Sequence, residues 1–323
     1  MIFVAGSANL DFVVRAPHIP APGETVLGRE FRTFPGGKGA NQAVACARAG
    51  GVETEMLLAL GDDAFAAPVE ASLKSAGVRL HAVRGTDQPT GTAFICVSDH
   101  GENAITVAPG ANGCLRDAHL PSLKGASHLL LQLEIPLETV IAFAKRAREC
   151  GVRVILNAAP MRDLPDELLA LVDVLVVNQG ELASLTGSRD DIAHCLARVT
   201  VPAVVVTLGE LGCIARIDGE ILTQPAYPVD VIDTTAAGDT FCGVLAASLS
   251  MNLGMPEALK HACAAGALAC TRAGAQQSIP TKAEVQAFLR AAPTAHEEQQ
   301  AALRRFCGLQ NQTGNPIEHA RQP

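Results

Sequence analysis

The segment over 233–241, Asp-Thr-Thr-Ala-Ala-Gly-Asp-Thr-Phe, combines residue types that suit phosphate chemistry. A helix-like pattern follows it at 243–250, and a helix N-terminus offers free N–H groups and partial positive charge to an anion. Asp239 lies in the first turn, where an Asp can act as a general base or can cap the helix. A second acid, Asp233, lies six residues upstream and favours the functional interpretation. The small residues that would let a ligand approach the backbone are Ala236, Ala237 and Gly238.

A glycine-rich segment over 34–45, Phe-Pro-Gly-Gly-Lys-Gly-Ala-Asn-Gln-Ala-Val-Ala, leads into a second predicted helix. Its three glycines in four positions would let a polar ligand come close to the backbone, and Asn41 would lie in the first turn of the helix. The spacing matches neither the G-x-x-x-x-G-K-[ST] loop nor the G-x-G-x-x-G fingerprint of nucleotide-binding proteins. Taken alone, the segment could also be a tight turn that enters a helix.

A third set consists of polar residues that directly follow predicted strands. Ligands of open α/β sheets bind outside the carboxyl ends of the strands. One such residue is usually part of a loop or a cap, but here several strands end in this way, which favours a binding site at this edge. The residues are Asn9, Asp11, Glu134, Asn178, Glu181, Thr207 and Gly209.

The elements that must position these residues alternate between short apolar runs and helical patterns. Near-continuous apolar runs are typical of parallel strands that are buried on both faces, and their alternation with helices indicates an α/β fold with a doubly wound, mostly parallel sheet. The predicted strands cover 2–5, 55–60, 128–131, 152–156, 172–177 and 203–207. The predicted helices cover 39–49, 65–75, 137–149, 181–186, 192–199 and 243–250.

Two segments, 13–34 and 93–107, break this alternation because they contain short strand-like stretches without helices. We expect them to form a small β-sheet beside the main one, and such an extension often acts as a lid. Residues 1–291 are expected to form a single α/β domain. The polar, Gln-rich tail over 292–323 is expected to be frayed.

The composition excludes several classes of protein. The 33 acidic residues against 25 Lys and Arg give a net charge of −8, which disfavours a nucleic-acid binder that depends on phosphate contacts. Aromatic residues make up 3% and Trp is absent, so base-stacking surfaces and membrane aromatic belts are not expected. No charge-free stretch is long and apolar enough for a membrane span, and the N-terminus reads as a first strand rather than a signal peptide.

Ten cysteines are scattered along the chain, and no two have C-x-x-C spacing. Several, such as Cys46 and Cys263, lie in apolar runs. Small buried thiols are typical of a reducing compartment, so we expect free cysteines and a cytoplasmic location.

Three motifs together resemble the phosphofructokinase-B family of carbohydrate kinases. They are the glycine-rich segment at 36–43, the segment at 233–241 and Thr-Arg-Ala-Gly-Ala-Gln at 271–276. The resemblance runs from about Met1 to Leu289. It implies a Rossmann-like α/β domain with a β lid, a homodimer formed through the lids, and ATP-dependent phosphorylation of a sugar.

The resemblance also implies roles for individual residues at the sugar. Asp239 would be the base that takes the proton from the acceptor hydroxyl, which is a modest task because phosphoryl transfer depends chiefly on positioning and electrostatics. The backbone of Ala236, Ala237 and Gly238 would form an anion hole for the transferred group. The sugar hydroxyls would be held by Asn9, Asp11, Gly37, Lys38, Asn41, Glu134 and Asp239.

For the nucleotide and the metals, the resemblance implies two further sets of residues. ATP would be bound by Asn178, Thr207, Gly209, Gly212, Ala237, Gly238 and Cys263, and Asn178 with Glu181 would help to place Mg²⁺ and its waters. A monovalent cation, K⁺ or another, would be held partly through carbonyl oxygens by Asp233, Thr235, Ala269, Arg272, Gly274 and Ser278. The chain departs from the family at Cys263, where a His near the adenine is common, and at Cys242, where an Asn is common.

The leading interpretation is ATP-dependent phosphorylation of D-ribose at its primary 5-hydroxyl, which gives ribose 5-phosphate. A polyol needs several fixed donors and acceptors, and the polar residues named above would supply them. Two alternatives stay open: a kinase of deoxyribose, a ketohexose or a nucleoside, and a catalytically idle sugar-binding protein on the same fold. The single Tyr weighs against a nucleoside. The expected partners are ATP and a small sugar, with no nucleic acid and no membrane.

Overall fold

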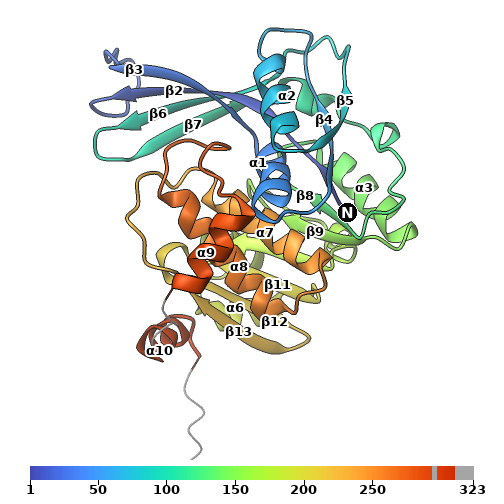
Figure 1. Cartoon of the computed structure of the whole chain (residues 1–323), viewed down its shortest axis with the longest axis vertical. Helices are drawn as coiled ribbons and strands as arrows, with labels where there is room; N and C mark the ends of the chain where they lie inside the picture. The colour runs from blue at the N-terminus through green and yellow to red at the C-terminus, as the bar shows by residue number, and fades with distance from the viewer. Residues whose placement is uncertain (293–296, 310–323) are drawn as a thin grey trace, which may run out of the picture.

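The computed structural model describes residues 1–292 and 297–309. These residues form a nine-stranded sheet and a separate four-stranded sheet, with helices packed around the larger one (Figure 1). The strand order in the large sheet is β13-β12-β11-β10-β9-β8-β1-β4-β5. Its strands are β1 (Ile2–Ala5), β4 (Thr54–Ala59), β5 (Arg79–Val83), β8 (His128–Leu131), β9 (Arg153–Asn157), β10 (Val174–Asn178), β11 (Ala203–Thr207), β12 (Gly212–Ile217) and β13 (Glu220–Pro225).

The large sheet is parallel from β5 to β11, and the β12–β13 hairpin extends it with antiparallel pairing. All six predicted strands are present, displaced by at most two residues at an end. The sequence reading missed β5, β12 and β13. The hairpin had a usable signal, because Asp218 and Gly219 lie between two alternating runs and both have positive φ, as a two-residue hairpin turn requires.

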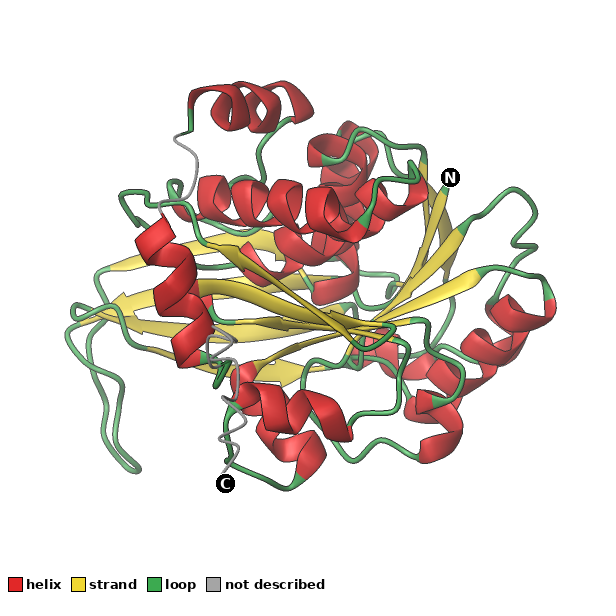
Figure 2. Ribbon diagram, turned by 90° about the horizontal axis from the view of Figure 1, so that it is seen from below, coloured by secondary structure: helices red, strands yellow, loops and turns green. Residues whose placement is uncertain are grey.

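Helices cover both faces of the large sheet, which confirms the doubly wound α/β architecture (Figure 2). Successive side chains of a strand point to opposite faces, so in β1 Ile2 and Val4 join one core and Phe3 and Ala5 the other. The first face carries α1 (Lys38–Val44), its continuation η1 (Ala45–Ala49), α2 (Ala66–Ser75), α7 (Ala237–Ser250), α8 (Met255–Cys270) and α9 (Lys282–Ala291). The second carries α3 (Leu137–Glu149), α4 (Asp166–Leu169), α5 (Gln179–Thr186), α6 (Ile192–Arg198) and α10 (Glu297–Phe306).

The small sheet is the expected β lid. Its strand order is β3-β2-β6-β7, and its strands project together from one side of the molecule (Figure 1). They are β2 (Asn9–Ala16), β3 (Glu30–Gly36), β6 (Gly91–Ser98) and β7 (Asn103–Ala108). Strand β2 begins four residues before the predicted segment, because the chain passes from β1 into the lid with a three-residue break. The lid strands therefore start at the carboxyl end of β1, where a ligand would bind.

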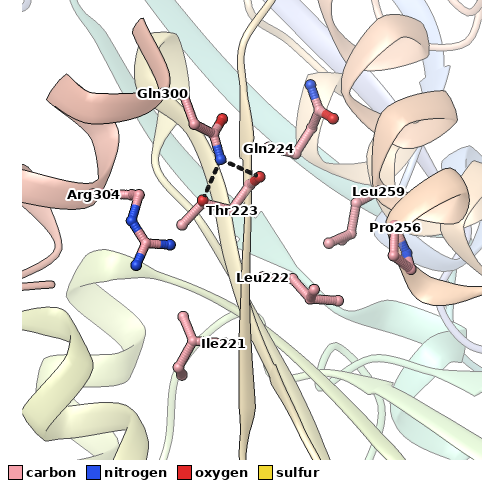
Figure 3. A pocket seen from close by; sticks show the side chains of 8 residues that line it. All are labelled: Ile221, Leu222, Thr223, Gln224, Pro256, Leu259, Gln300 and Arg304. Atoms are coloured by element: carbon pink, nitrogen blue, oxygen red, sulfur yellow. Dashed lines mark hydrogen bonds between the residues drawn. The ribbon is translucent and has the colours of Figure 1, made fainter. Parts of the chain in front are cut away.

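The C-terminal part differs from the expected frayed tail, because residues 297–306 form helix α10. This helix lies against the edge strand β13, where the Gln300 side chain donates to the backbone and the hydroxyl of Thr223 (Figure 3). Leu303 is 2% exposed in the core, and the carbonyl of Cys307 accepts from the N–H of Ala193. Residues 293–296 and 310–323 of the same tail lie outside the described residues.

A small pocket of about 210 Å³ remains between α10, β13 and α8 (Figure 3). Its lining is formed by Ile221, Leu222, Thr223, Gln224, Pro256, Leu259, Gln300 and Arg304. Within residues 1–292 and 297–309, no helix has the length and apolar character that a membrane crossing needs.

Candidate functional site

Asp239 lies at the buried N-terminus of α7, as the sequence predicts. The residue before this helix, Ala236, adopts a left-handed conformation with φ 59°, which turns the chain into the helix. The N–H of Ala237 donates to the carbonyl of Thr234 at 3.2 Å. Among the described residues, no protein group accepts from the N–H of Ala236 or Gly238. Two of the three amides predicted to form an anion hole are thus available to a ligand.

The carboxylate of Asp239 is held by two amide side chains from the glycine-rich helix α1. Asn41 Nδ2 donates to Oδ2 at 2.9 Å, and Gln42 Nε2 donates to Oδ1 at 3.0 Å. Asn41 and Asp239 are buried, and Asn41 Oδ1 has no hydrogen-bond partner among the described residues. A buried acceptor without a partner is costly, so a free Oδ1 beside Asp239 suits a ligand hydroxyl.

Two further carboxylates, Asp11 and Glu134, lie near Asp239. Burial, with smaller contributions from the charges of Glu134 and Asp239, raises the pKa of Asp11 to about 7. Glu134 Oε2 accepts from the hydroxyl of Ser7 at 2.5 Å and from the backbone N–H of Lys38 at 3.0 Å. Three acids in one region give a cluster of acceptors, and a partly protonated Asp11 adds a donor.

Asn9 also lies in this region. Its side chain is held by Asn112, a residue that the sequence analysis did not identify. Asn112, in the turn η2 (Gly110–Cys114), donates from Nδ2 to Asn9 Oδ1 at 2.8 Å. The same Asn112 accepts from the N–H of Ala8 and donates to its carbonyl, so it ties the end of β7 to the start of β2. A side chain on Gly91 would occupy this space, because its Cβ would lie 2.2 Å from Asn112 Nδ2.

Lys38 introduces a positive charge among these acids. The charge of Asp239 raises the pKa of Lys38, burial opposes this rise, and Glu134 adds to it. The ammonium group is therefore protonated at neutral pH. Gly37, which precedes it, has φ 88°, and a Cβ there would lie 2.9 Å from the backbone of Ala8 and Asn9, so this turn requires glycine.

A cleft of about 240 Å³ opens between the N-terminus of α7 and the carboxyl ends of β9, β10 and β11. Seven of the predicted site residues line it: Lys38, Asn178, Glu181, Thr207, Ala236, Gly238 and Asp239. The remaining lining residues are Asn157, Ala159, Val176, Val177, Thr234 and Cys242. Cys242, one of the two departures from the family pattern, thus lies at the cleft, and burial raises the pKa of its thiol well above the usual value.

Asn178 and Glu181 form a capping box at the start of α5. Asn178 Oδ1 accepts from the N–H of Glu181 at 2.8 Å, and Glu181 Oε2 accepts from the N–H of Asn178 at 2.7 Å. Burial raises the pKa of Glu181, while the Asn178 N–H and the charge of Lys38 lower it. The pair therefore has a structural role, and it also presents a half-buried carboxylate to the cleft. A single carboxylate beside a phosphate-sized space suits Mg²⁺, which keeps several waters in proteins.

The predicted nucleotide residues are only partly brought together. Thr207 ends β11 at the cleft, whereas Gly209, Gly212 and Cys263 are not part of its lining. Gly212 has φ 110°, and a Cβ there would lie 2.1 Å from the carbonyl oxygen of Gln224, so its glycine is required by the hairpin. Cys263 is buried in α8 with its Sγ 3.6 Å from Cys213 Sγ.

Three of the predicted cation residues, Asp233, Thr235 and Gly274, are connected by hydrogen bonds. Asp233 Oδ1 accepts from the N–H and hydroxyl of Thr235, and Oδ2 accepts from the N–H of Gly274 at 2.9 Å. Burial would raise the pKa of Asp233, but these hydrogen bonds hold it below its usual value. Ala269 and Ser278 are buried nearby in the chain, and the Arg272 guanidinium is paired with Glu284 at 2.5 Å. Among the described residues, no group of three or more His, Cys, Asp or Glu side chains forms a metal site.

Three comparisons place this geometry among known proteins. The pfkB family of carbohydrate kinases matches residues 1–282. Ribokinase from Haemophilus influenzae is 37% identical over 298 residues, which cover 88% of this chain and 97% of that protein. A bifunctional ribokinase/ribose-5-phosphate isomerase A from Fructilactobacillus sanfranciscensis is 39% identical over 295 residues, 87% of this chain but 54% of that longer protein.

A solved structure of Arabidopsis thaliana ribokinase complexed with ribose and ATP is similar in fold. Its TM-score is 0.81 at 34% identity, and the match covers 90% of this chain and 98% of that one. The family match over residues 1–282 includes both motifs at the cleft, 36–43 and 233–241. This chain belongs to the pfkB family of carbohydrate kinases.

Proposed function

We propose that this protein transfers the γ-phosphoryl group of ATP to the primary 5-hydroxyl of D-ribose. The observation that carries the proposal is the buried Asp239 carboxylate, fixed by Asn41 and Gln42 at a helix N-terminus that opens on the cleft. The similarity to ribokinases, one of them solved with ribose and ATP, supports this choice of substrates. The rival in another class is an idle sugar-binding protein, and the intact Asp239 weighs against it.

In this mechanism Asp239 accepts the proton of the 5-hydroxyl as the oxygen attacks the phosphorus. The phosphoryl group needs positive potential where its charge develops, and the N-terminus of α7 would supply it through the free amides of Ala236 and Gly238. The Lys38 ammonium adds a second positive group at the same cleft. Removal of a general base typically lowers the rate about 10²–10⁴-fold. We assign the remaining stabilisation of the transition state to the backbone amides and to Lys38.

The sugar is proposed to lie between the cleft and the lid. Asn9, Asp11, Asn41 and Glu134 would bind its hydroxyls, with the backbone of Gly37 and Lys38 along one side. Asn41 Oδ1 and the carboxylate oxygens of Glu134 accept hydrogen bonds, and Asp11, whose pKa is raised to about 7, can donate or accept near neutral pH. This mixture of donors and acceptors suits a polyol better than a planar base.

ATP would extend along the carboxyl ends of β10 and β11, past Asn178 and Thr207 towards the loop with Gly209 and Gly212. Cys263 remains a candidate for the adenine end of this site. Mg²⁺ would be held near Asn178 and Glu181 through water, and when bound it would neutralise charge on the phosphates. We propose no direct coordination by the carboxylate of Glu181, because one of its oxygens already caps α5.

We further propose that K⁺ or a similar cation binds between two segments that the Gly274–Asp233 hydrogen bond joins. Its ligands would come from Asp233, Thr235, Ala269, Arg272, Gly274 and Ser278. Carbonyl oxygens there would supply most of the ligands, and the segment with Asp233 leads directly into the 236–238 amides. A bound cation would therefore fix the anion hole without contact with the substrate. Rates measured in potassium and in sodium buffers of equal ionic strength test this, and equal rates would contradict it.

A homodimer through the lids is the proposed assembly. The lid presents apolar side chains to solvent, with Phe31 65% and Phe94 54% exposed and Ile105 and Val107 also exposed. Rings of Phe12, Phe31 and Phe94 stack at 5.4–6.0 Å between centroids, which gives the lid a continuous apolar surface. Sedimentation of wild type and of a Phe31→Asp variant tests the proposal, because the variant should be monomeric. The ten free thiols suit the proposed cytoplasmic location.

A panel of acceptors tests the substrate. ADP release should be measured with ribose, 2-deoxyribose, fructose and a nucleoside at equal concentrations, together with the position of the phosphate on the product. We expect ribose to give the highest kcat/KM and the product to carry phosphate on O5. A faster reaction with another sugar would refute ribose but leave a kinase, and no turnover with any acceptor would favour the sugar-binding alternative.

A further inference from the structure

Four buried polar side chains form a continuous hydrogen-bonded chain behind the cleft. They are Gln42 in α1, Asn157 at the end of β9, Asp239 in α7, and Gln132, which directly follows β8. Gln132 Nε2 donates to Gln42 Oε1 at 2.7 Å. Gln42 Nε2 donates at 3.0 Å both to Asp239 Oδ1 and to Asn157 Oδ1. Gln42 and Gln132 have no exposed surface, so water cannot replace these partners.

The orientation of every amide in this chain follows from the carboxylate. An ionised Asp accepts only, so Gln42 must turn its NH₂ group towards Asp239 and its oxygen away. That oxygen then requires a donor, which Gln132 provides with its own NH₂ group. The second proton of Gln42 is used by Asn157, whose Nδ2 donates to the carbonyl of Val176. Each amide has one orientation that satisfies its neighbours, so Gln42 is fixed from both ends.

Two glycines make room for this arrangement. A Cβ on Gly243, one turn beyond Asp239, would lie 2.6 Å from the carbonyl oxygen of Gln42, so glycine there allows α1 and α7 to come close. A Cβ on Gly6 would lie 2.0 Å from Gln132 Oε1. That oxygen is buried and has no partner among the described residues, which is a cost that a purely structural core would avoid.

We propose that Gln42 is a positioning residue for the phosphoryl transfer, with Gln132 and Asn157 as its supports. Gln42 holds the plane of the Asp239 carboxylate, which fixes the direction from which that carboxylate can accept the 5-hydroxyl proton. Gln42 has no exposed surface, so it cannot contact the sugar directly. This inference rests on the proposed function, in which Asp239 is the base.

The first test replaces Gln42 with an apolar side chain of similar length, Gln42→Met. A base that is misplaced by about 1 Å can lose about 100-fold in rate, so we expect kcat to fall 10- to 100-fold. The KM for ribose should stay within threefold, because no sugar contact is removed. A kcat within threefold of wild type, or a KM that rises as much as kcat falls, would overturn the proposal.

A double-mutant cycle separates positioning from loss of stability. Gln132→Met alone should lower kcat 3- to 10-fold, because Gln42 loses its donor, and it should add less than twofold in the Gln42→Met background. Independent, multiplying effects would overturn the proposal. Thr139→Val is the matched control: it removes a buried hydrogen bond of 2.8 Å to the carbonyl of Leu115, neither residue lines the cleft, and the variant should leave kcat unchanged. If Gln42→Met does not fold, the kcat of Gln132→Met decides alone. A kcat equal to that of wild type would then refute the positioning role of Gln42.

A last variant distinguishes this inference from the function on which it rests. If Asp239→Asn slows turnover at least about 100-fold and adding Gln42→Met changes the remaining turnover by less than threefold, Gln42 acts through Asp239. If Asp239→Asn is inactive but Gln42→Met keeps wild-type kcat, the positioning role is wrong and the proposed function stands. If Asp239→Asn is as active as wild type, the base assignment fails, and the positioning role fails with it.

Discussion

The buried Asp11 carboxyl should make the protein less stable as pH rises towards neutrality. Its pKa is raised from 3.8 to about 7, first by burial and then by the charges of Glu134 and Asp239. Between these two values the folded protein binds more protons at this site than the unfolded chain does. The free energy of unfolding must therefore fall with rising pH across that window, and the loss is complete above about pH 7.

The magnitude follows from the size of the shift. One pKa unit corresponds to 1.36 kcal/mol, so the change from 3.8 to about 7 amounts to about 4 kcal/mol in total. About 3 kcal/mol of this falls between pH 5 and pH 8, where the enzyme can be handled. In Asp11→Asn the titrating group is absent, so the variant should gain about 3 kcal/mol relative to wild type over that interval.

Urea denaturation of wild type and Asp11→Asn at pH 5, 6, 7 and 8 measures this difference, because the contributions of groups that do not interact with Asp11 cancel. Asp63→Asn is a suitable control. The hydrogen bonds that Asp63 accepts from Thr90, Phe65 and Ala66 outweigh burial and lower its pKa, so its contribution is constant above pH 5. A difference between Asp11→Asn and wild type that stays flat from pH 5 to pH 8 would refute the argument.

Three further variants test other parts of the structure. Leu303→Ala removes a buried anchor of α10 and should lower the free energy of unfolding by about 2–5 kcal/mol in urea; a loss below 0.5 kcal/mol would mean that α10 does not dock. Gly212→Ala forces a Cβ to 2.1 Å from a carbonyl oxygen at φ 110° and should lower stability by about 1–3 kcal/mol in the same assay; unchanged stability would contradict the turn described here. Ser7→Ala removes a donor to Glu134 and should raise the KM for ribose about tenfold with a smaller effect on kcat; an unchanged KM would place Glu134 away from the sugar.

The parts of the fold that the sequence predicts are those set by local pattern. Strands such as β8 and β11 are apolar runs with turn residues around them, and the structure has them at the predicted positions. Strand β5 was not predicted because its residues Arg79–Val83 are a mixture of exposed and half-buried positions, as expected at a sheet edge. Helix α10 was not predicted because most of its residues are polar, and its single buried face becomes apparent only through its contacts with β13 and α6.

The candidate site shows the same division. Asp239 and the glycine-rich turn could be found because each belongs to a short motif with a local physical reason. Asn112, Gln132 and Asn157 could not, because each acts through a partner about 20 to more than 100 residues away, and single amides are common in any sequence. Asn178 with Glu181 was found as a metal motif, and the structure adds that the same spacing caps α5.

The central claim is that Asp239 is the base for phosphorylation of ribose. Its most direct test compares wild type and Asp239→Asn in two measurements, the rate of ADP release with saturating ribose and the dissociation constant of ribose by calorimetry. We expect the rate to fall at least about 100-fold while the dissociation constant changes less than about tenfold. A variant that turns over ribose as fast as wild type would contradict the account.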